Sequence, residues 1–436
     1  MYAASPQVMQ VVEEMKNQSL PRIHLKGLTG SSAALIKAAV FHHLQRNHLV
    51  IMNDPESAAY LYNDLETLFQ EKGQPYEHKN TLFFPTVYKR HFEFDRPDRT
   101  NMLMRSEVLS RIVSSNKKTI IISYAEALTE KVVRKKVLTK NTLRLKVGEK
   151  VSLDFVADVL NEYGFDREDF VYEPGQFSIR GGILDVFSFA HDNPFRIEFF
   201  GEEVESIRSF DPATQLSVDK MDRITILPDM SERIEVESRE SFLTFLPPGA
   251  AIWVQDFNGL NDMQDLQEDR LNKLVENDKE GIFPSNLRDH FVKKEDFIRQ
   301  VLDHGMVEMS RQPYLEAGLH ISFGTSPQPS FNKNFDLLTA NLEENSKAGL
   351  SNFILSDNPR QIERIYTIFE DLKQSRQQSR NFEFSTLNIS LHEGFIDHQL
   401  RLALYTDHQI FERYHKFHLK DSYSSREAIT LKELYN

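Results

Sequence analysis

One pattern near the start of the chain constrains its fold most strongly: a strand, a glycine-containing loop, a helix and a second strand follow one another. A short apolar segment at Ile23 leads into the loop Gly27–Ser32, and apolar residues then recur at helical spacing. The run Leu49–Met52 is typical of a buried strand, so this order is a βαβ unit. Because further helix patterns and another apolar run at Thr119–Ser123 follow, the sequence predicts a parallel sheet covered by helices.

The loop at Gly27 has part of the pattern of a phosphate-binding P-loop, G-x-x-x-x-G-K-[ST]. The candidate nucleotide contacts in this frame are Gly27, Thr29, Gly30 and Ser31. Ala33 and Ala34 occupy the positions of the lysine that contacts phosphate and of the hydroxyl that binds Mg²⁺. ATP hydrolysis is therefore not expected. A retained strand–turn–helix scaffold and residual phosphate binding at the helix N-terminus both stay open.

The pattern changes at about residue 145, where apolar and polar residues begin to alternate. We interpret Gly181 and Gly182 as strand positions at a β-bulge or at the close approach of another backbone. Strand-like segments flank Gly201 and Glu202 at the spacing of a hairpin. These features predict a small antiparallel α+β domain inserted into the first domain, to which the chain returns at Ile252–Val254.

A second α/β domain is expected after a junction marked by Pro327 and Pro329. Its helix and strand patterns alternate in the order Asn334–Asn345, Ser351–Ser356, Gln361–Lys373 and Phe384–Ser390. The polar stretch Asp421–Asn436 is interpreted as a linker, which makes the chain a fragment of a longer protein. The predicted fold class is therefore α/β: a degenerate helicase-like, P-loop-type parallel-sheet domain, an inserted small α+β domain and a second small α/β domain.

Charge balance and residue usage exclude several kinds of protein. The 436 residues include 52 Lys and Arg against 65 Asp and Glu, a net charge of −13. Phosphate backbones need a cationic surface, so binding of nucleic acid over the whole molecule is not expected, although a local basic patch stays open. Without cysteine, the chain forms no disulfide and no thiolate metal site. No signal peptide and no run of about 18 apolar residues is found, so we expect a cytoplasmic protein without a membrane partner.

The sequence contains no catalytic or metal-binding motif. Neither H-E-x-x-H nor G-x-S-x-G occurs, and the Asp-Glu-x-Asp/His motif that organises Mg²⁺ in helicase motors is missing. We therefore predict no catalytic residue, no metal ligand and no cofactor in this chain.

Arginines in the inserted domain point to a binding surface instead. Arg180 precedes the glycine pair, and Arg167 and Arg196 lie nearby in the sequence. Because a guanidinium can form a bidentate contact with a carboxylate, these side chains are suited to the acidic groups of a partner. From the residues alone, it also stays open that these arginines form ordinary ion pairs within the chain.

An ordered series of motifs between Leu143 and Pro228 carries a resemblance to known families. The series comprises Leu145–Glu149, Gly175–Phe187, Arg196–Val204 and Ile207–Asp211. These segments resemble the N-terminal region of the bacterial transcription-repair coupling factors (Mfd), a region that is similar to the excinuclease protein UvrB. The segments His392–Phe395 and Leu402–Tyr405 look like the next domain of the coupling factors, which UvrB lacks. The resemblance covers roughly residues 20–436.

The resemblance implies three domains. Residues 1–130 and 235–312 would form a degenerate UvrB-like helicase domain, residues 131–234 an inserted UvrA-binding α+β domain, and residues 313–436 a small α/β domain ending in a linker. In the family, the contact with RNA polymerase and the ATP- and Mg²⁺-dependent DNA translocase lie beyond this region. Between Phe84 and Pro97 the sequence has no long aromatic insertion like the DNA-clamping hairpin of UvrB.

The resemblance further implies a non-catalytic module that binds the excinuclease protein UvrA and brings nucleotide excision repair to stalled RNA polymerase. Its candidate partner-binding residues are Arg180, Gly181, Gly182, Arg167, Arg196 and Phe187. An intramolecular contact with the C-terminal region is expected to mask this surface in the full-length protein. Two alternatives stay open, an autoinhibitory module that docks on the missing motor and a direct DNA-binding module. A fragment that retains ATPase activity is disfavoured by Ala33 and Ala34.

Overall fold

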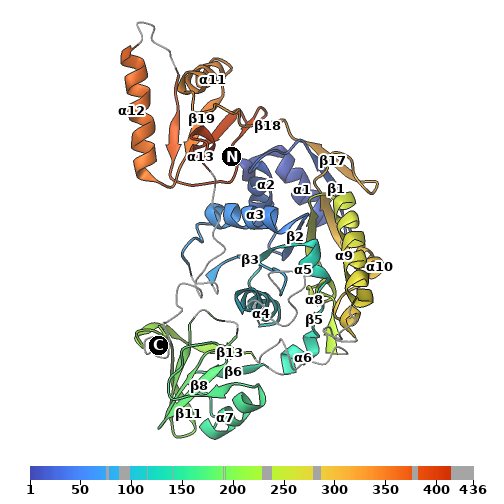
Figure 1. Ribbon diagram of the computed structural model, residues 1–436, viewed down its shortest axis with the longest axis vertical. Coiled ribbons are helices and arrows are strands. Elements are labelled where there is room, and N and C mark those ends of the chain that lie inside the picture. Colours follow the sequence, from blue (N-terminus) through green and yellow to red (C-terminus); the bar gives the residue numbers. More distant parts are fainter. Residues whose placement is uncertain are drawn as a thin grey trace.

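Seven parallel strands from two distant parts of the chain form the largest sheet (Figure 1). Their order across the sheet is β17-β1-β16-β15-β2-β4-β3, and every neighbouring pair is parallel. The strands are β1 (Arg22–Lys26), β2 (His48–Met52), β3 (Thr81–Phe83), β4 (Ile120–Tyr124), β15 (Ala251–Val254), β16 (Gly305–Glu308) and β17 (Leu319–Ser322). The predicted α/β fold class is therefore confirmed.

The structure is a computed structural model that describes most of the chain. The described residues are 1–74, 78–87, 99–114, 116–140, 142–189, 191, 193–227, 238–277, 286–375 and 382–413. Most of Phe84–Pro97 and all of Asp421–Asn436 lie outside them, so the predictions of a missing hairpin and of a terminal linker fall on residues that the structure does not describe.

The central strands are buried on both faces because their sequences are almost continuously apolar. All positions of β2, β4 and β15 are buried, as expected for a parallel sheet with helices on its faces. The polar side chain of His48 accepts one internal hydrogen bond. The Trp253 indole donates to His48 Nδ1 at 2.9 Å, and burial lowers the pKa of His48 to about 3, which keeps the ring neutral and able to accept.

The helices of the first domain begin where capping residues allow them. In α1 (Pro6–Asn17) and α3 (Pro55–Leu68), a proline in the first turn follows Ser5 and Asp54, whose side-chain oxygens accept backbone N–H groups. The other helical segments of this domain are η1 (Tyr2–Ala4), α2 (Ser32–His43), α4 (Arg99–Ser114), α5 (Ala125–Thr129), α6 (Lys135–Lys140), α8 (Phe242–Phe245), α9 (Phe257–Asn277), η4 (Leu287–His290) and α10 (Lys294–Leu302). The short strands β5 (Val132–Val133) and β14 (Arg239–Glu240) pair with each other.

The inserted domain combines one helix with two antiparallel sheets. The larger sheet has the order β12-β11-β10-β9-β8-β7, in which only β7 and β8 are parallel, and the smaller pairs β6 with β13. The elements are β6 (Leu143–Lys146), α7 (Leu153–Glu162), β7 (Asp166–Arg167), β8 (Gln176–Arg180), β9 (Ile183–Val186), β10 (Phe195–Phe200), β11 (Glu203–Phe210), β12 (Ser217–Met221) and β13 (Arg223–Ile226). Val156 and Leu160 of α7 pack on the inner face of the larger sheet, which includes Phe177 and Ile197.

The glycine pair of this domain forms a turn and not the interior of a strand. Gly181 and Gly182 connect β8 to β9, and the φ angle of +62° at Gly181 is one that glycine adopts without steric cost. The predicted close approach of a backbone is present at Gly182, where a Cβ would lie 2.9 Å from the carbonyl oxygen of Phe199. Gly201 and Glu202 form the predicted hairpin turn between β10 and β11.

The last domain contains a five-stranded mixed sheet. Its order is β18-β21-β22-β19-β20, with β19 parallel to both of its neighbours. The elements are β18 (Thr325–Pro327), α11 (Phe335–Lys347), β19 (Ser351–Leu355), α12 (Pro359–Ser375), β20 (Ser385–Leu387), β21 (Phe395–Asp397), β22 (Leu402–Thr406) and α13 (Asp407–Ile410).

Two predicted domain boundaries assign elements of the first domain to the neighbouring domains. The boundary at residue 313 assigned β17 to the last domain, whereas β17 pairs with β1 along Leu319–Ser322. The boundary at residue 130 assigned β5 and α6 to the inserted domain, whereas Val132, Val133 and Leu138 pack in the core of the first domain. Local patterns missed both connections because the packing partners are more than 90 residues away in the sequence.

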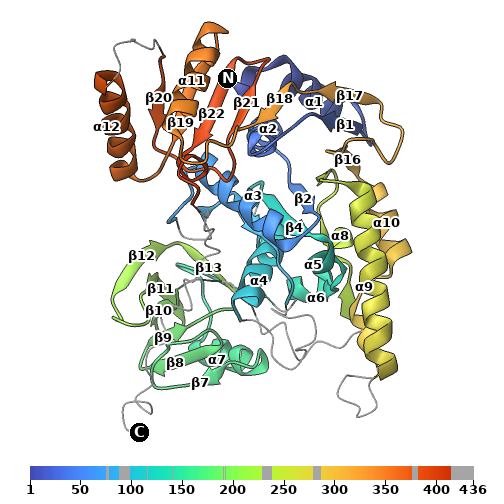
Figure 2. The ribbon, with the colours of Figure 1, turned by 45° about the horizontal axis from the view of Figure 1, so that its top comes forward.

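The last domain and the inserted domain lie at opposite ends of the first domain (Figures 1 and 2). The N-terminus touches the last domain, where the Tyr2 hydroxyl donates to Asp397 Oδ2 at 2.6 Å. Among the described residues, no helix is long and apolar enough to cross a membrane.

Candidate functional site

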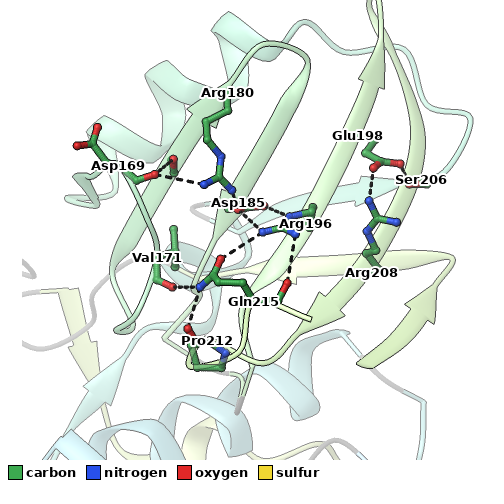
Figure 3. Close-up of polar contacts among 11 residues, drawn as sticks. Asp169, Val171, Arg180, Asp185, Arg196, Glu198, Ser206, Arg208, Pro212 and Gln215 are labelled. Carbon is green, nitrogen blue, oxygen red and sulfur yellow. Dashed lines mark hydrogen bonds and ion pairs between the residues drawn. The ribbon is translucent and has the colours of Figure 1, made fainter. Parts of the chain in front are cut away.

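Two of the predicted arginines converge on one buried carboxylate, Asp185 of β9 (Figure 3). Arg196 of β10 donates from Nε and Nη2 to the two Asp185 oxygens at 2.7 and 2.8 Å, and Arg180 of β8 donates to the same carboxylate. The hydrogen bond to Asp185 raises the pKa of Arg196 above its ordinary value. Two cations facing one anion leave the cluster with a net positive charge.

Each of the two guanidiniums also lies over an aromatic ring. Arg196 lies over Phe210 at 4.5 Å from the ring centroid, and Arg180 lies over Phe170 at 4.8 Å. Phe210 is buried together with Val171 and Phe187. The candidate contact Phe187 is only 2% exposed, so it supports the cluster from beneath and does not reach a partner. Phe187 directly follows β9, where it lies on the same side as Asp185 and is covered by Val171 and Phe210.

The outer face of this cluster combines exposed charge with exposed aromatic surface. The Arg180 side chain is 37% exposed and Arg196 only 16%, so Arg180 is the cation that a partner can reach. Phe170 beneath Arg180 is 48% exposed, and Tyr172 lies 6.4 Å from Phe170 between ring centroids. Arg167 of β7 is exposed, with no ion pair among the described residues. The structure does not bring Arg167 to this surface, because Arg167 is the register partner of Phe177, whose side chain faces the domain core. We define this surface as the Arg180 face: Arg180, Phe170 and Tyr172.

Phe170 and Tyr172 were not predicted from the sequence. A weak signal was available, because two aromatic residues alternate in a polar stretch directly after Arg167. Asp185 was not predicted as a binding partner of the arginines either, since its pairing with Arg196 exists only across neighbouring strands.

A strained residue closes the inner side of the cluster. Gln215 has a φ angle of +60°, which is uncommon for a residue with a side chain. Its amide donates to the carbonyl oxygens of Pro212 at 2.8 Å and Val171 at 3.4 Å, and its side-chain oxygen accepts from Arg196 at 3.3 Å (Figure 3). These contacts hold the turn after β11 against the cluster, which favours a fixed orientation of Arg196.

The Gly27 loop, the second candidate site, is covered by the last domain. The Thr29 N–H donates to Thr325 Oγ1 at 2.9 Å, and the Ser31 N–H donates to the carbonyl oxygen of Glu393 at 3.1 Å. In return, the Glu393 N–H donates to Ser31 Oγ at 3.0 Å. Donors that would cradle phosphate in a P-loop are therefore used within the chain.

The glycines of this loop are required by the same contact. Gly27 has a φ angle of +80°, and a Cβ there would overlap the carbonyl oxygen of Phe323. Gly30 has a φ angle of +51°, and a Cβ there would lie 2.8 Å from the carbonyl oxygen of Gly394. The glycine spacing that resembles a P-loop thus allows the backbone after β17 to approach at Gly27 and the backbone of the last domain to approach at Gly30.

A buried acid lies behind this interdomain contact. Asp64 of α3 accepts the His392 N–H at 2.7 Å, and the Tyr60 ring stacks on the His392 ring. Burial raises the pKa of Asp64 to about 7, against the lowering effect of its hydrogen bonds with Ser31 and His392. No sequence motif marks Asp64, because its role depends on a segment more than 300 residues away.

A lysine in the helix after the loop does not replace the missing P-loop lysine. Lys37 lies one helical turn beyond Ala33, with its Nζ 3.1 Å from the sulfur of Met309 and 5.7 Å from the centre of the Trp253 ring. Burial lowers the pKa of Lys37 to about 7. Its ammonium group is buried in the core, where it also donates to the carbonyl oxygen of Ala33 at 3.4 Å. Within the described residues, no three His, Cys, Asp or Glu side chains gather in a way that could hold a metal ion.

Comparison with known proteins finds a family match within the inserted domain. Residues 143–231 match the family model of the UvrB interaction domain. The chain is 26% identical over 269 residues to the transcription-repair-coupling factor of Bacillus subtilis (strain 168), covering 62% of this chain and 22% of that protein. It is 29% identical over 230 residues to the transcription-repair-coupling factor of Myxococcus xanthus, covering 53% of this chain and 19% of that protein.

This chain is also similar to UvrB proteins. The UvrABC system protein B of Ureaplasma parvum is 29% identical over 248 residues, covering 55% of this chain and 37% of that protein. The predicted resemblance to both families is therefore confirmed. The aligned part of this chain spans between 19% and 37% of the length of these three relatives.

Proposed function

We propose that this chain is a non-catalytic recruitment module that binds UvrA through the Arg180 face. The observation that carries this proposal is the Arg180 guanidinium, which is exposed above Phe170 within the segment that matches the UvrB interaction domain. In this proposal the bound UvrA brings nucleotide excision repair to lesions where RNA polymerase has stalled. Contacts with RNA polymerase and DNA, and ATP-driven translocation, would be functions of longer relatives.

The chemistry of the Arg180 face supports a partner with an acidic and partly apolar surface. Arg180 donates to Asp185 and, at 3.5 Å, to the carbonyl oxygen of Asp169, which leaves further N–H groups of its guanidinium for a carboxylate. Phe170 and Tyr172 add aromatic area, which is enriched at the centres of protein interfaces. Because the charged contact is exposed, its attraction falls as salt shortens the Debye length.

Calorimetric titration with UvrA tests the proposal directly. Wild type should bind, and Arg180→Glu should lose at least tenfold in affinity because it places an acid opposite the partner's acid. Phe170→Ala should weaken binding without a change in charge. The matched control is Lys220→Glu, an equal charge change at an exposed residue of β12 in the same sheet. Melting curves establish that each variant is folded.

The outcomes separate the candidate functions. Loss of affinity in Arg180→Glu and not in Lys220→Glu would support the Arg180 face as the docking surface. No binding by folded wild type would contradict recruitment and favour the intramolecular alternative, in which this face docks on the C-terminal region. In that case a separately supplied C-terminal region should bind the chain, and Arg180→Glu should weaken that contact.

We further propose that the Gly27 loop holds no nucleotide and serves as a contact between domains. This is supported by the use of the Thr29 and Ser31 N–H groups by Thr325 and Glu393. Titration with a fluorescent ATP analogue in the presence of Mg²⁺ should show no saturable binding, and phosphate release should stay at background. Saturable binding that is lost on replacement of Ser31 by Glu would contradict this proposal.

A further inference from the structure

The connection between the first domain and the inserted domain is basic in a chain that is acidic overall. Seven of the sixteen residues from Lys131 to Lys146 are Lys or Arg, and none is Asp or Glu. This stretch includes β5, α6 and β6, which lie where the two domains meet (Figure 1). The net charge of −13 for the whole chain therefore conceals a local surface of opposite sign.

The exposed cations of this connection are not neutralised. Arg134, Lys136, Lys140, Arg144 and Lys146 are exposed, and none forms an ion pair with the described residues. Some cations elsewhere in the first domain have acidic partners: Lys294 contacts Asp265 at 2.5 Å and Arg270 contacts Glu126 at 3.2 Å. The nearest acids in sequence lie outside the stretch.

The β6–β13 sheet adds a sixth cation, Arg223, at a position where it repels another cation. Lys146 and Arg223 are directly opposite each other in the antiparallel pair, and both are exposed. Like charges at opposed positions destabilise a sheet, so this pairing is a cost that a bound anion would relieve. Leu145 and Ile224 face the core, which fixes the cations on the outer face. We define the basic strip as Arg134, Lys136, Lys140, Arg144, Lys146 and Arg223.

Lys131 and Arg239 add two further cations close to His290, at the start of the connection. The pKa of His290 lies below its ordinary value, first because of burial and then because Arg239 and Lys131 face it, with Asp289 opposing. The Lys131 N–H donates to the carbonyl oxygen of His290, which joins this region to β5 at the start of the connection.

We propose that the basic strip binds the phosphate backbone of duplex DNA, without dependence on base sequence or on a lesion. A diffuse array of cations without acidic partners is what release of counterions from a phosphate backbone requires. Arg144 and Lys146 are two residues apart on one face of β6, about 6.7 Å. That distance is close to the axial separation of alternate phosphates on one DNA strand, about 6.8 Å.

The composition of the strip favours nucleic acid over an acidic protein. Interface centres between proteins are depleted of lysine and enriched in aromatic side chains. Three of the six strip residues are lysine and none is aromatic. The exposed aromatic residues Phe170 and Tyr172 lie on the Arg180 face instead. This inference does not rest on UvrA binding and concerns a different surface.

The test is fluorescence anisotropy of an undamaged 20-base-pair duplex titrated with the full 436-residue chain. Wild type should bind at 50 mM salt and lose about 10³-fold in affinity at 200 mM if all six cations engage phosphates. The variant Lys136→Glu, Lys140→Glu, Arg144→Glu should lower the slope of log K against log salt by about 2.7, since each contact contributes about 0.9.

The matched control reverses three exposed cations outside the strip, Lys16, Lys273 and Arg360, to Glu. Both triple variants carry a net charge of −13 − 6 = −19. Loss of DNA affinity in the strip variant alone supports the proposal. No binding by wild type at 50 mM salt, or equal loss in both variants, would overturn it. Loss of UvrA affinity in the strip variant with DNA binding unchanged would also overturn it and assign the strip to a protein partner.

Discussion

At the scale of single residues, the Arg180 face depends on a buried acid that binds two arginines. Asp185 is 1% exposed and accepts two hydrogen bonds from Arg196 as well as one from Arg180. A buried carboxylate is stable only with such partners, because desolvation of an unpaired charge is costly. The outward orientation of Arg180 therefore follows from the position of Asp185 on the next strand.

Replacement of this acid should destabilise the protein strongly. Asp185→Asn removes the charge that neutralises Arg196, and we expect the free energy of unfolding to fall by about 3 kcal/mol. Urea denaturation measures the change. The control is Glu198→Gln in the same sheet, which breaks the ion pair with Arg208. The side chains of Arg208 and Glu198 are 31% and 30% exposed. That change should cost less than about 1 kcal/mol, and equal losses for the two variants would contradict the role of Asp185.

At the scale of elements, the Gly27 loop and the start of α2 show how a pattern can be retained with a different use. The loop keeps the strand–loop–helix geometry, yet its N–H groups donate to Thr325 and Glu393 of the last domain. Ala33 and Ala34 were visible in the sequence and indicated the loss of phosphate chemistry. The partner of the loop was not visible, because segments far along the chain supply it.

The close approach at Gly30 predicts the effect of an added methyl group. Gly30→Ala should lower the free energy of unfolding by about 2–3 kcal/mol, since the Cβ meets Gly394 in addition to the positive φ. The control Gly73→Ala has a φ angle of +78° with nothing within 4 Å, so it should cost about 1 kcal/mol. Hydrogen exchange at Glu393 and Gly394 should accelerate only in Gly30→Ala. Equal costs and unchanged exchange would show that the loop does not hold the last domain.

At the scale of the whole molecule, the first domain connects the inserted domain to the last domain. The inserted domain presents the Arg180 face, the basic strip draws its residues from both the first and the inserted domain, and the last domain closes over the Gly27 loop. Asp64, buried where the first and last domains meet, makes this closure sensitive to pH.

The pH dependence of stability follows from the pKa of Asp64. That pKa is about 7 in the folded chain and 3.8 in the absence of structure, so between these values the folded state binds more protons. The contribution of Asp64 to stability is therefore highest near pH 4 and falls as pH rises to about 7, by at most about 1.4 kcal/mol per pH unit.

Urea denaturation of wild type and Asp64→Asn from pH 5 to pH 8 measures this contribution by difference. The wild type should lose stability relative to the variant up to about pH 7 and then change in parallel with it. Lys72 and Glu393, which face Asp64, are present in both proteins. The lowered pKa of Lys37 acts above about pH 7 and is likewise shared. Parallel profiles across the whole range would show that folding does not raise the pKa of Asp64.

Local sequence patterns were enough to establish the class of fold and the presence of an inserted antiparallel domain, and they predicted the loss of P-loop chemistry. These depend on periodicity, turn residues and motif spacing, which are properties of neighbouring residues. The same patterns identified Arg180 and Arg196, although not the carboxylate that orients them. The resemblance to coupling factors and UvrB came from ordered motifs within a single segment.

Which side chains face solvent, and which distant segments meet, became apparent only in the folded chain. Phe187 turned inward, β17 joined the first sheet, and Glu393 covered the Gly27 loop. Each of these outcomes depends on contacts between residues far apart in the chain. Local patterns carry no record of such pairings, because the free energy that selects them comes from burial and hydrogen bonding across the assembled core.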